Sequence, residues 1–362
     1  MRGRSGSKAT IAQQRLANQR VTQHGQRDPA KLVAWLGAVQ AQEFGPAKWG
    51  LGLRLSPGIS DATIQRAFDA GRILRTHVMR PTWHFVTPAD IGWMVELTGA
   101  SVHRRMATYD RQLGLDASIF RRAARLCERV LRDRNFLTRE ELGTHFAAAG
   151  VPGSGWALGH IALYIEAEGV ICSGPRRGKQ STYALLAERA PTAVRLSREE
   201  ALGELARRYF RSHGPATLRD FVWWSGLTTP DAKRGLEMIR ARQLKVADKS
   251  YWTLHAASGR PRRQPAHLLP VYDEYLVAYR DRRAVPHGPS MVRARSGGYT
   301  RFQHALVIKG QVAGTWRGVA TRAGVDVNLA PLRPLTTAET RAVRREVARY
   351  ERFLGVPVSL SR

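Results

Sequence analysis

The sequence predicts an α+β protein made of tandem winged helix-turn-helix units, with a β-rich C-terminal element and a terminal helix. Two segments, 137–186 and 216–255, repeat the same order of helix, turn, helix and hairpin. That order is the winged helix-turn-helix, in which the hairpin forms the wing. The last third of the chain instead shows strand-like alternation. We therefore expect units at 8–115, 116–190, 197–258 and 265–362.

The first unit is expected to begin with an amphipathic helix. Asp28 is suited to the N-cap and Pro29 to the first turn, and an apolar stripe follows them. This helix should carry Gln40 and Gln42 near its C-terminal end. The two neutral amides come at the point where the apolar stripe stops.

A second helix of the same unit is expected from Asp61 to Ala70. The segment 71–86 then has the composition of two short strands around a turn near Arg80 and Pro81. Helices followed by a hairpin predict a first winged helix.

The second unit should start at a capping box, Thr138 with Glu141, in which each side chain caps the other's backbone N–H. A glycine-rich turn leads to a second helix. Strands are expected at 170–172 and 182–185, around the basic turn 174–181 (GPRRGKQS).

In the third unit, Thr217 with Asp220 should start one helix, and Thr229-Pro230 the next. A hairpin is expected in 243–254. Beyond it, 267–282 and 300–318 alternate like strands, and 336–355 is expected to form a terminal helix.

The charge balance points to a polyanionic partner. The chain of 362 residues has 58 Lys and Arg against 29 Asp and Glu, a formal net charge of +29. No apolar run approaches the roughly 20 residues that span a bilayer, and the start lacks a signal-peptide core. We expect no membrane association and a cytoplasmic, nucleoid-associated location. Only the first eight residues resemble a basic tail.

The two cysteines, Cys127 and Cys172, stand in neither a C-x-x-C pair nor a histidine cluster. We expect both in the core, with no disulfide, no metal and no cofactor.

Four stretches together resemble the AlkZ-like DNA glycosylases, over nearly the whole chain. They are the glutamine-apolar-glutamine motif at 40–42, 79–84 (MRPTWH), the basic hairpin 174–180 and 268–282 (LLPVYDEYLVAYRDR). Pro81 departs from the family pattern, which has glycine there. The resemblance implies three winged helices arranged as a C-shaped clamp with a β-rich element. It also implies a monofunctional glycosylase that removes alkylated bases from double-stranded DNA and unhooks interstrand crosslinks.

By the same resemblance, Gln40 and Gln42 are the expected catalytic pair. An N7-alkylated guanine is already cationic and leaves as a neutral purine, so no general acid is needed. What remains is to position a water against the oxocarbenium-like sugar, and an amide oxygen can accept from that water. Neutral amides would restrict catalysis to labile, alkylated or crosslinked guanine.

Further residues are candidates for DNA contact, from the strand that contains the MRPTWH motif and from the basic hairpin. They are Arg80, Thr82, His84, Arg176, Arg177 and Lys179. The large aromatics Trp83, Trp223 and Trp224 are expected to be core residues. In the patch Asp273, Glu274, Arg280 and Asp281, we expect the carboxylates to pair with nearby arginines.

The alternative is a non-catalytic winged-helix transcriptional regulator, in which Gln40 and Gln42 read base edges. Such regulators commonly bind as symmetric dimers, and the chain shows no heptad dimerisation helix. We therefore expect a monomeric enzyme. An RNA-binding protein fits the charge equally well but lacks an aromatic ribonucleoprotein motif.

Overall fold

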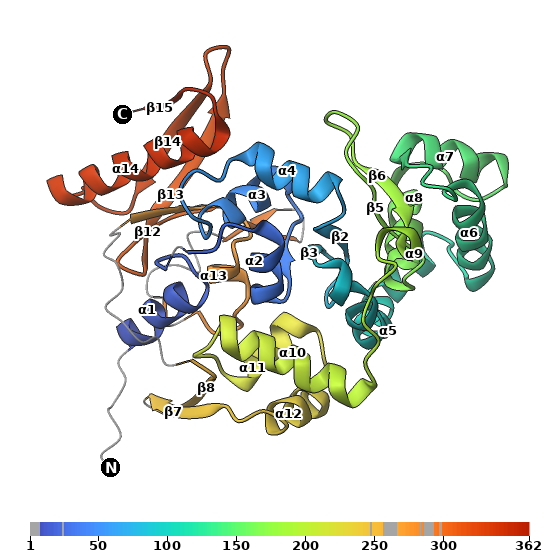
Figure 1. Ribbon diagram of the computed structural model, residues 1–362, viewed down its shortest axis with the longest axis horizontal. Coiled ribbons are helices and arrows are strands. Elements are labelled where there is room, and N and C mark those ends of the chain that lie inside the picture. Colours follow the sequence, from blue (N-terminus) through green and yellow to red (C-terminus); the bar gives the residue numbers. More distant parts are fainter. Residues whose placement is uncertain are drawn as a thin grey trace.

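The computed structural model of the chain describes residues 8–23, 25–246, 248–255, 266–282, 284–285, 293–296 and 299–361. Helices and strands mix along the whole of this part, which confirms the α+β class (Figure 1). The first seven residues, which belong to the expected basic tail, lie outside the described residues.

One order of elements occurs in full twice in the described chain: a helix, a short strand, two helices and a hairpin. The first unit contains α2 (Pro29–Leu36), β1 (Val39–Gln40), α3 (Phe44–Gly52), α4 (Asp61–Asp69), β2 (Leu74–His77) and β3 (Trp83–Val86). The second contains α6 (Ala117–Val130), β4 (Leu137–Thr138), α7 (Arg139–Ala148), α8 (Gly155–Ala167), β5 (Ile171–Ser173) and β6 (Thr182–Leu185). Each short strand pairs with the last strand of its own hairpin, β1 with β3 and β4 with β6.

The third unit follows the same plan with α10 (Arg198–Ser212), α11 (Leu218–Ser225), α12 (Thr229–Glu237), β7 (Arg242–Val246) and β8 (Lys249–Thr253). A single bridge between Ala216 and Trp252 replaces its short strand. The helices between and before the units are α1 (Lys8–Asn18), α5 (Pro88–Gln112) and α9 (Leu186–Arg189). The expected sequence of elements is present, whereas the exact unit boundaries remain a prediction.

The expected helix starts are confirmed in the second and third units. Thr138 with Glu141 and Thr217 with Asp220 form complete capping boxes. Such a box satisfies two of the N–H groups that a helix start leaves without partners. The helix expected at Asp61 also begins there.

The expectation that Gln40 and Gln42 end a helix is wrong. Gly37, with φ of 84°, donates its N–H to Val33 O and ends α2 at Leu36. Only glycine adopts this conformation readily, so the helix ends at Leu36, three residues before the apolar stripe ends at Val39. Gln40 lies in β1 instead, and Gln42 in the bend that leads to α3.

The C-terminal unit is a five-stranded sheet with a helix, as expected, but one segment differs. Its order is β15-β14-β13-β12-β9, and its elements are β9 (Ala266–Leu269), β12 (His304–Ile308), β13 (Gln311–Ala320), β14 (Val325–Pro331), α14 (Thr337–Leu354) and β15 (Val358–Leu360). A separate hairpin joins β10 (Arg293–Ser296) and β11 (Tyr299–Phe302). Of 267–282, only the start is strand: Asp273 caps a short helix, α13 (Glu274–Val277).

The first unit lies between the C-terminal sheet and the third unit (Figure 1). Trp49 in α3 donates its indole N–H to Leu268 O at 2.7 Å and packs on Phe353, so one core spans both units. On the other side, Leu74 in β2 shares a second core with Trp224 in α11. Phe85 in β3 belongs to the first of these cores, so the sheet β1-β3-β2 packs against a core on each face.

Both cysteines are fully buried in apolar clusters, which confirms the expectation that they are core residues.

Candidate functional site

Three polar side chains form one row across the sheet β1-β3-β2. Gln40 is paired with His84, and His84 with Thr76 on the next strand. Residues directly opposite one another project to the same face of a sheet. The sheet thus brings Gln40 and His84, which are 44 positions apart, to one place.

The two glutamines have different surroundings. Gln40 is 7% exposed, and its Oε1 is buried with no hydrogen-bond partner among the described residues. Gln42 is partly exposed, and its Oε1 accepts from the backbone N–H of Trp83 at 3.3 Å. Gln42 therefore has its amide NH₂ group available for a ligand.

A buried carboxylate from the C-terminal unit holds the backbone of Gln40. Glu274 Oε1 accepts the N–H of Gln40 at 2.7 Å, and its Oε2 accepts from Trp224 Nε1 at 3.0 Å and from His213 Nε2 at 3.2 Å. Burial alone would raise the pKa of Glu274, but His213, the Gln40 N–H and Arg80 outweigh it and lower that pKa to about 2. Burial lowers the pKa of His213, although its hydrogen bond to Glu274 opposes this.

Arg80 lies beside this network in the turn between β2 and β3. Its guanidinium is buried, and its Nε and one terminal nitrogen have no partner in the described part of the chain. Burial lowers its pKa, although Glu274 opposes this. Arg80 and Arg280 both approach the ring of Trp223, at 5.9 and 5.4 Å. Cationic donors without partners suit an anionic ligand such as a phosphate.

Pro81 is accommodated in this turn without loss of a backbone bond. The turn is closed by the N–H of Arg80 to Val78 O and by the N–H of Thr82 to Arg80 O, each at 2.7 Å. Neither bond needs a donor at position 81, and proline has none.

His84 and Thr82, both expected to contact DNA, have buried polar atoms in the structure. His84 is fully buried, and its Nδ1 lies 2.8 Å from Thr82 O, so it presents no surface to DNA in this structure. Burial and the charge of Arg80 lower the pKa of His84 to about 3. The hydroxyl of Thr82 is buried and lacks a hydrogen-bond partner among the residues that are described.

On the opposite face of the sheet, Arg75 holds the glutamine motif in place. It donates to Ala41 O at 2.9 Å and to Gln42 O at 3.2 Å, and its guanidinium lies 4.2 Å from the ring centre of Trp83. Burial lowers its pKa to about 10, so it stays cationic at neutral pH. Glu166 in α8 accepts from Trp83 Nε1 at 3.2 Å and contacts His77.

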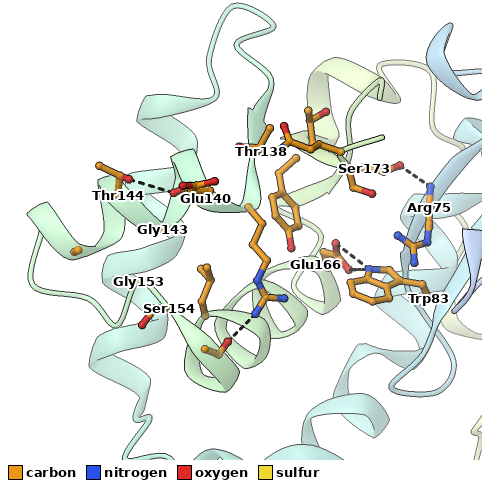
Figure 2. Close-up of a pocket in the computed structure, with 18 residues that line it drawn as sticks. Arg75, Trp83, Thr138, Glu140, Gly143, Thr144, Gly153, Ser154, Glu166 and Ser173 are labelled. Carbon is orange, nitrogen blue, oxygen red and sulfur yellow. Dashed lines mark hydrogen bonds between the residues drawn. The ribbon is translucent and has the colours of Figure 1, made fainter. Parts of the chain in front are cut away.

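Arg75 and Trp83 also line a cavity of about 830 Å³ between the first and second units. Figure 2 shows both on one side of it, and Thr138, Glu140 and Ser154 on the other. Gln40 and Gln42 are not among its lining residues, so the row that contains Gln40 lies outside this cavity.

The basic hairpin between β5 and β6 is only partly available for DNA. Arg177 pairs with Glu141 at 2.5 Å and donates to Phe136 O, and Arg176 lies 4.6 Å from the ring centre of Phe44. Lys179 is exposed at the tip.

The expected pairing of the C-terminal carboxylates with arginines holds for Asp273, which binds Arg54 through both oxygens at 2.7 and 2.8 Å. The expectation is wrong for Glu274, which accepts from Gln40, Trp224 and His213. Asp281 pairs with Lys249. Sequence reasoning missed these contacts because His213 and Glu274 are 61 positions apart. For the contacts of Glu166 one signal was present, because Glu166 is a charge within the otherwise apolar run 161–167 (IALYIEA).

Of the aromatics expected in the core, Trp224 is fully buried, whereas Trp83 and Trp223 are only half-buried. A tryptophan that the sequence did not single out, Trp156, is 78% exposed in the first turn of α8.

Two features are absent from the described residues: a cluster of metal-ligating side chains and a helix that could span a membrane. They contain no group of three or more His, Cys, Asp or Glu side chains arranged to hold a metal ion. None of their helices has the length and apolarity needed to cross a bilayer.

Comparisons with known proteins agree with this architecture. The family model "DNA glycosylase AlkZ-like" matches residues 33–353. The chain is 24% identical to the interstrand DNA cross-link repair glycosylase of Streptomyces sahachiroi, over 94% of this chain and 95% of that protein. Its fold matches the solved structure of S. sahachiroi DNA glycosylase AlkZ with a TM-score of 0.81 and 22% identity, over 99% of this chain and 100% of that one. The chain belongs to the AlkZ-like family of DNA glycosylases and is an enzyme of that class.

Proposed function

We propose that this glycosylase hydrolyses the N-glycosidic bond of N7-alkylated guanine in double-stranded DNA, including guanines tied into interstrand crosslinks. The observation that carries this is the neutral amide pair beside a buried cation. Gln40 and Gln42 lie together at β1, Arg80 has donors without partners, and Glu274 is occupied by N–H donors. The name of the S. sahachiroi relative supports the crosslink part of the proposal.

The chemistry follows from the charge of the substrate. An N7-alkylated guanine leaves as a neutral purine, so the enzyme has to place a water and stabilise the developing positive charge on the sugar. An amide oxygen can accept a hydrogen bond from that water, and an amide NH₂ can hold its orientation. Without an ionised carboxylate aimed at the sugar, catalysis should be confined to labile bases.

The position of Gln42 also fits bulky lesions. Its side chain is partly exposed, and it is not among the residues that line the cavity in Figure 2. A base crosslinked to the opposite strand could not be rotated into a deep pocket, so an open site suits it. A net charge of +29 favours duplex DNA as the partner. We propose a monomer that acts at the nucleoid.

Replacing either glutamine should greatly slow excision while DNA binding remains. The measurement uses an end-labelled duplex with one N7-methylguanine, and abasic sites are cleaved with mild alkali. We expect Gln40→Ala and Gln42→Ala to lower the single-turnover rate by about 100-fold or more. Wild-type cleavage no faster than spontaneous depurination, on this substrate and on a nitrogen-mustard crosslink, would contradict the proposal.

Trp156 should contribute to DNA affinity, because α8 is the second helix of its helix-turn-helix and such helices enter a groove. Burying a large apolar side chain against a partner contributes about 1.5–3 kcal/mol. We expect Trp156→Ala to weaken binding to undamaged duplex by about that amount, and Trp156→Phe by less. Fluorescence anisotropy measures it, with Val356→Ala as a control at an exposed apolar site of the C-terminal unit. Equal affinities of Trp156→Ala and wild type would exclude this role.

Membership of a glycosylase family removes the basis for the transcriptional regulator considered above. A regulator would bind a defined duplex sequence and release no base. The same alkali assay would therefore distinguish the two.

A further inference from the structure

The geometry of β1 and β3 makes Gln40 and His84 close cross-strand neighbours. The N–H of Ala41 donates to Trp83 O at 2.7 Å, so that N–H points toward β3. Backbone directions alternate along a strand, and the N–H of Gln40 accordingly points outward to Glu274. Gln40 and His84 are therefore a non-hydrogen-bonded pair, the type in which Cα atoms lie about 4.5 Å apart and side chains approach most closely.

The tautomer of His84 is fixed by its own strand. Its Nδ1 lies 2.8 Å from Thr82 O, and a carbonyl oxygen can only accept, so Nδ1 has the proton. The ring is fully buried, and its pKa is lowered to about 3, so it is neutral. His84 Nε2 is therefore a lone-pair acceptor that faces the protein interior.

This acceptor needs a donor, and the described residues supply none while the Gln40 amide oxygen is turned inward. His84 Nε2 and Gln40 Oε1 are then both buried acceptors without partners. The oxygen and nitrogen of a glutamine amide are nearly equal in size, so a half-turn of the amide exchanges them with little change in packing. The half-turn puts the Gln40 NH₂ in the place of the buried oxygen, on the face of the sheet that Gln40 shares with His84.

We propose that His84 is a positioning residue for the reaction: its Nε2 accepts from the side-chain NH₂ of Gln40 and turns the Gln40 carbonyl oxygen toward the DNA. This rests on the proposed function, in which Gln40 handles the attacking water. The two glutamines then differ in role. Gln42, whose oxygen is bound to the Trp83 N–H, offers a donor, whereas Gln40 offers the acceptor that the water requires.

Thr76, on the other side of His84, is the competing partner, because its buried hydroxyl also lacks a partner in the described structure. By the same alternation, Thr76 and His84 form a hydrogen-bonded pair, in which the Cα atoms are wider apart at about 5.5 Å. Gln40 is therefore the nearer neighbour. Thr76→Val, which removes the hydroxyl and keeps the shape, is the matched control.

The contact can be measured without any activity. In protein labelled with ¹⁵N-histidine, the ring nitrogens of His84 are assigned by their absence in His84→Phe. We expect a neutral ring protonated at Nδ1, with an Nε2 resonance that shifts in Gln40→Ala and stays in place in Thr76→Val. A shift in Thr76→Val alone, or in neither variant, would overturn the proposal.

The functional consequence is a change in rate without a change in binding. On a duplex with one N7-methylguanine, we expect His84→Phe to lower the single-turnover rate by about 10- to 100-fold at unchanged DNA affinity. His84→Asn, whose side-chain oxygen can accept from Gln40, should recover part of the rate. A wild-type rate in His84→Phe would overturn the positioning role. Wild-type excision by Gln40→Ala, with the resonance shift present, would instead show that the contact exists and that the proposed function of Gln40 is wrong.

Discussion

Glu274→Gln should remove most excision activity, because this carboxylate fixes the strand that contains Gln40. The carboxylate accepts from three N–H donors, on Gln40, Trp224 and His213. A glutamine amide has only one oxygen, so its NH₂ group would face at least one of these donors. Unpairing a buried charged network commonly costs about 3–5 kcal/mol. We expect the single-turnover rate to fall by about 100-fold or more.

The exposed Glu200, in the capping box of α10, provides a control of the same chemical type. Glu200→Gln should leave excision unchanged, since glutamine also serves in a capping box. If Glu274→Gln does not fold, Trp224→Phe removes one donor and keeps the carboxylate, and it should show a smaller loss. Full activity in Glu274→Gln would mean that the strand is held without this contact.

The same group gives a signature in the dependence of stability on pH. The folded-state pKa of Glu274 is about 2, below its ordinary value of 4.5, with His213 and Arg80 facing it. Its stabilisation is thus fully present above the ordinary value and is lost as pH falls from there toward about 2. The free energy of unfolding, measured with denaturant, should therefore fall more steeply with decreasing pH for the wild type than for Glu274→Gln in this range. Parallel curves for the two proteins would rule out this contribution.

Arg54→Met should cause the largest loss of stability. The guanidinium lies in the core between the first unit and the C-terminal unit, with 2% of its side chain exposed. It bonds both oxygens of Asp273, Gly50 O and Gln19 Oε1. Removing one member leaves a buried, uncompensated carboxylate, so we expect a fall of about 3–5 kcal/mol in the free energy of unfolding, measured with denaturant.

A surface pair provides the comparison for Arg54. Arg72 and Asp28 are also in contact at 2.5 Å, but their side chains are 54% and 26% exposed. Arg72→Met should cost less than about 1 kcal/mol. Pairing Arg54→Met with Asp273→Asn removes both charges and should recover part of the loss. Equal effects of Arg54→Met and Arg72→Met would contradict the buried network.

The local elements were predictable from the sequence because their signals are local. The capping boxes at Thr138 and Thr217 and the strands around Arg80 depend on neighbouring residues. The end of α2 was not predicted, because the apolar stripe continues to Val39 while the backbone turns at Gly37. The partners of Gln40 were also out of reach, since His84 and Glu274 meet it only through strand pairing and packing between units.

A comparison of the three units shows that the glutamine motif lies where the other two units have a capping threonine. At the junction between the short strand and the next helix, the second unit has the capping threonine Thr138, and the third has Thr217. In the first unit the same junction holds Gln40 to Gln42, and α3 starts at Phe44 after an N-cap residue, Glu43, whose side chain makes no capping hydrogen bond. Such a cap is worth about 0.5–2 kcal/mol. A fold built from repeated units can thus accept a less stable helix start in one unit, where we propose that Gln40 and Gln42 act on the substrate, while the equivalent helix starts of the other two units remain capped.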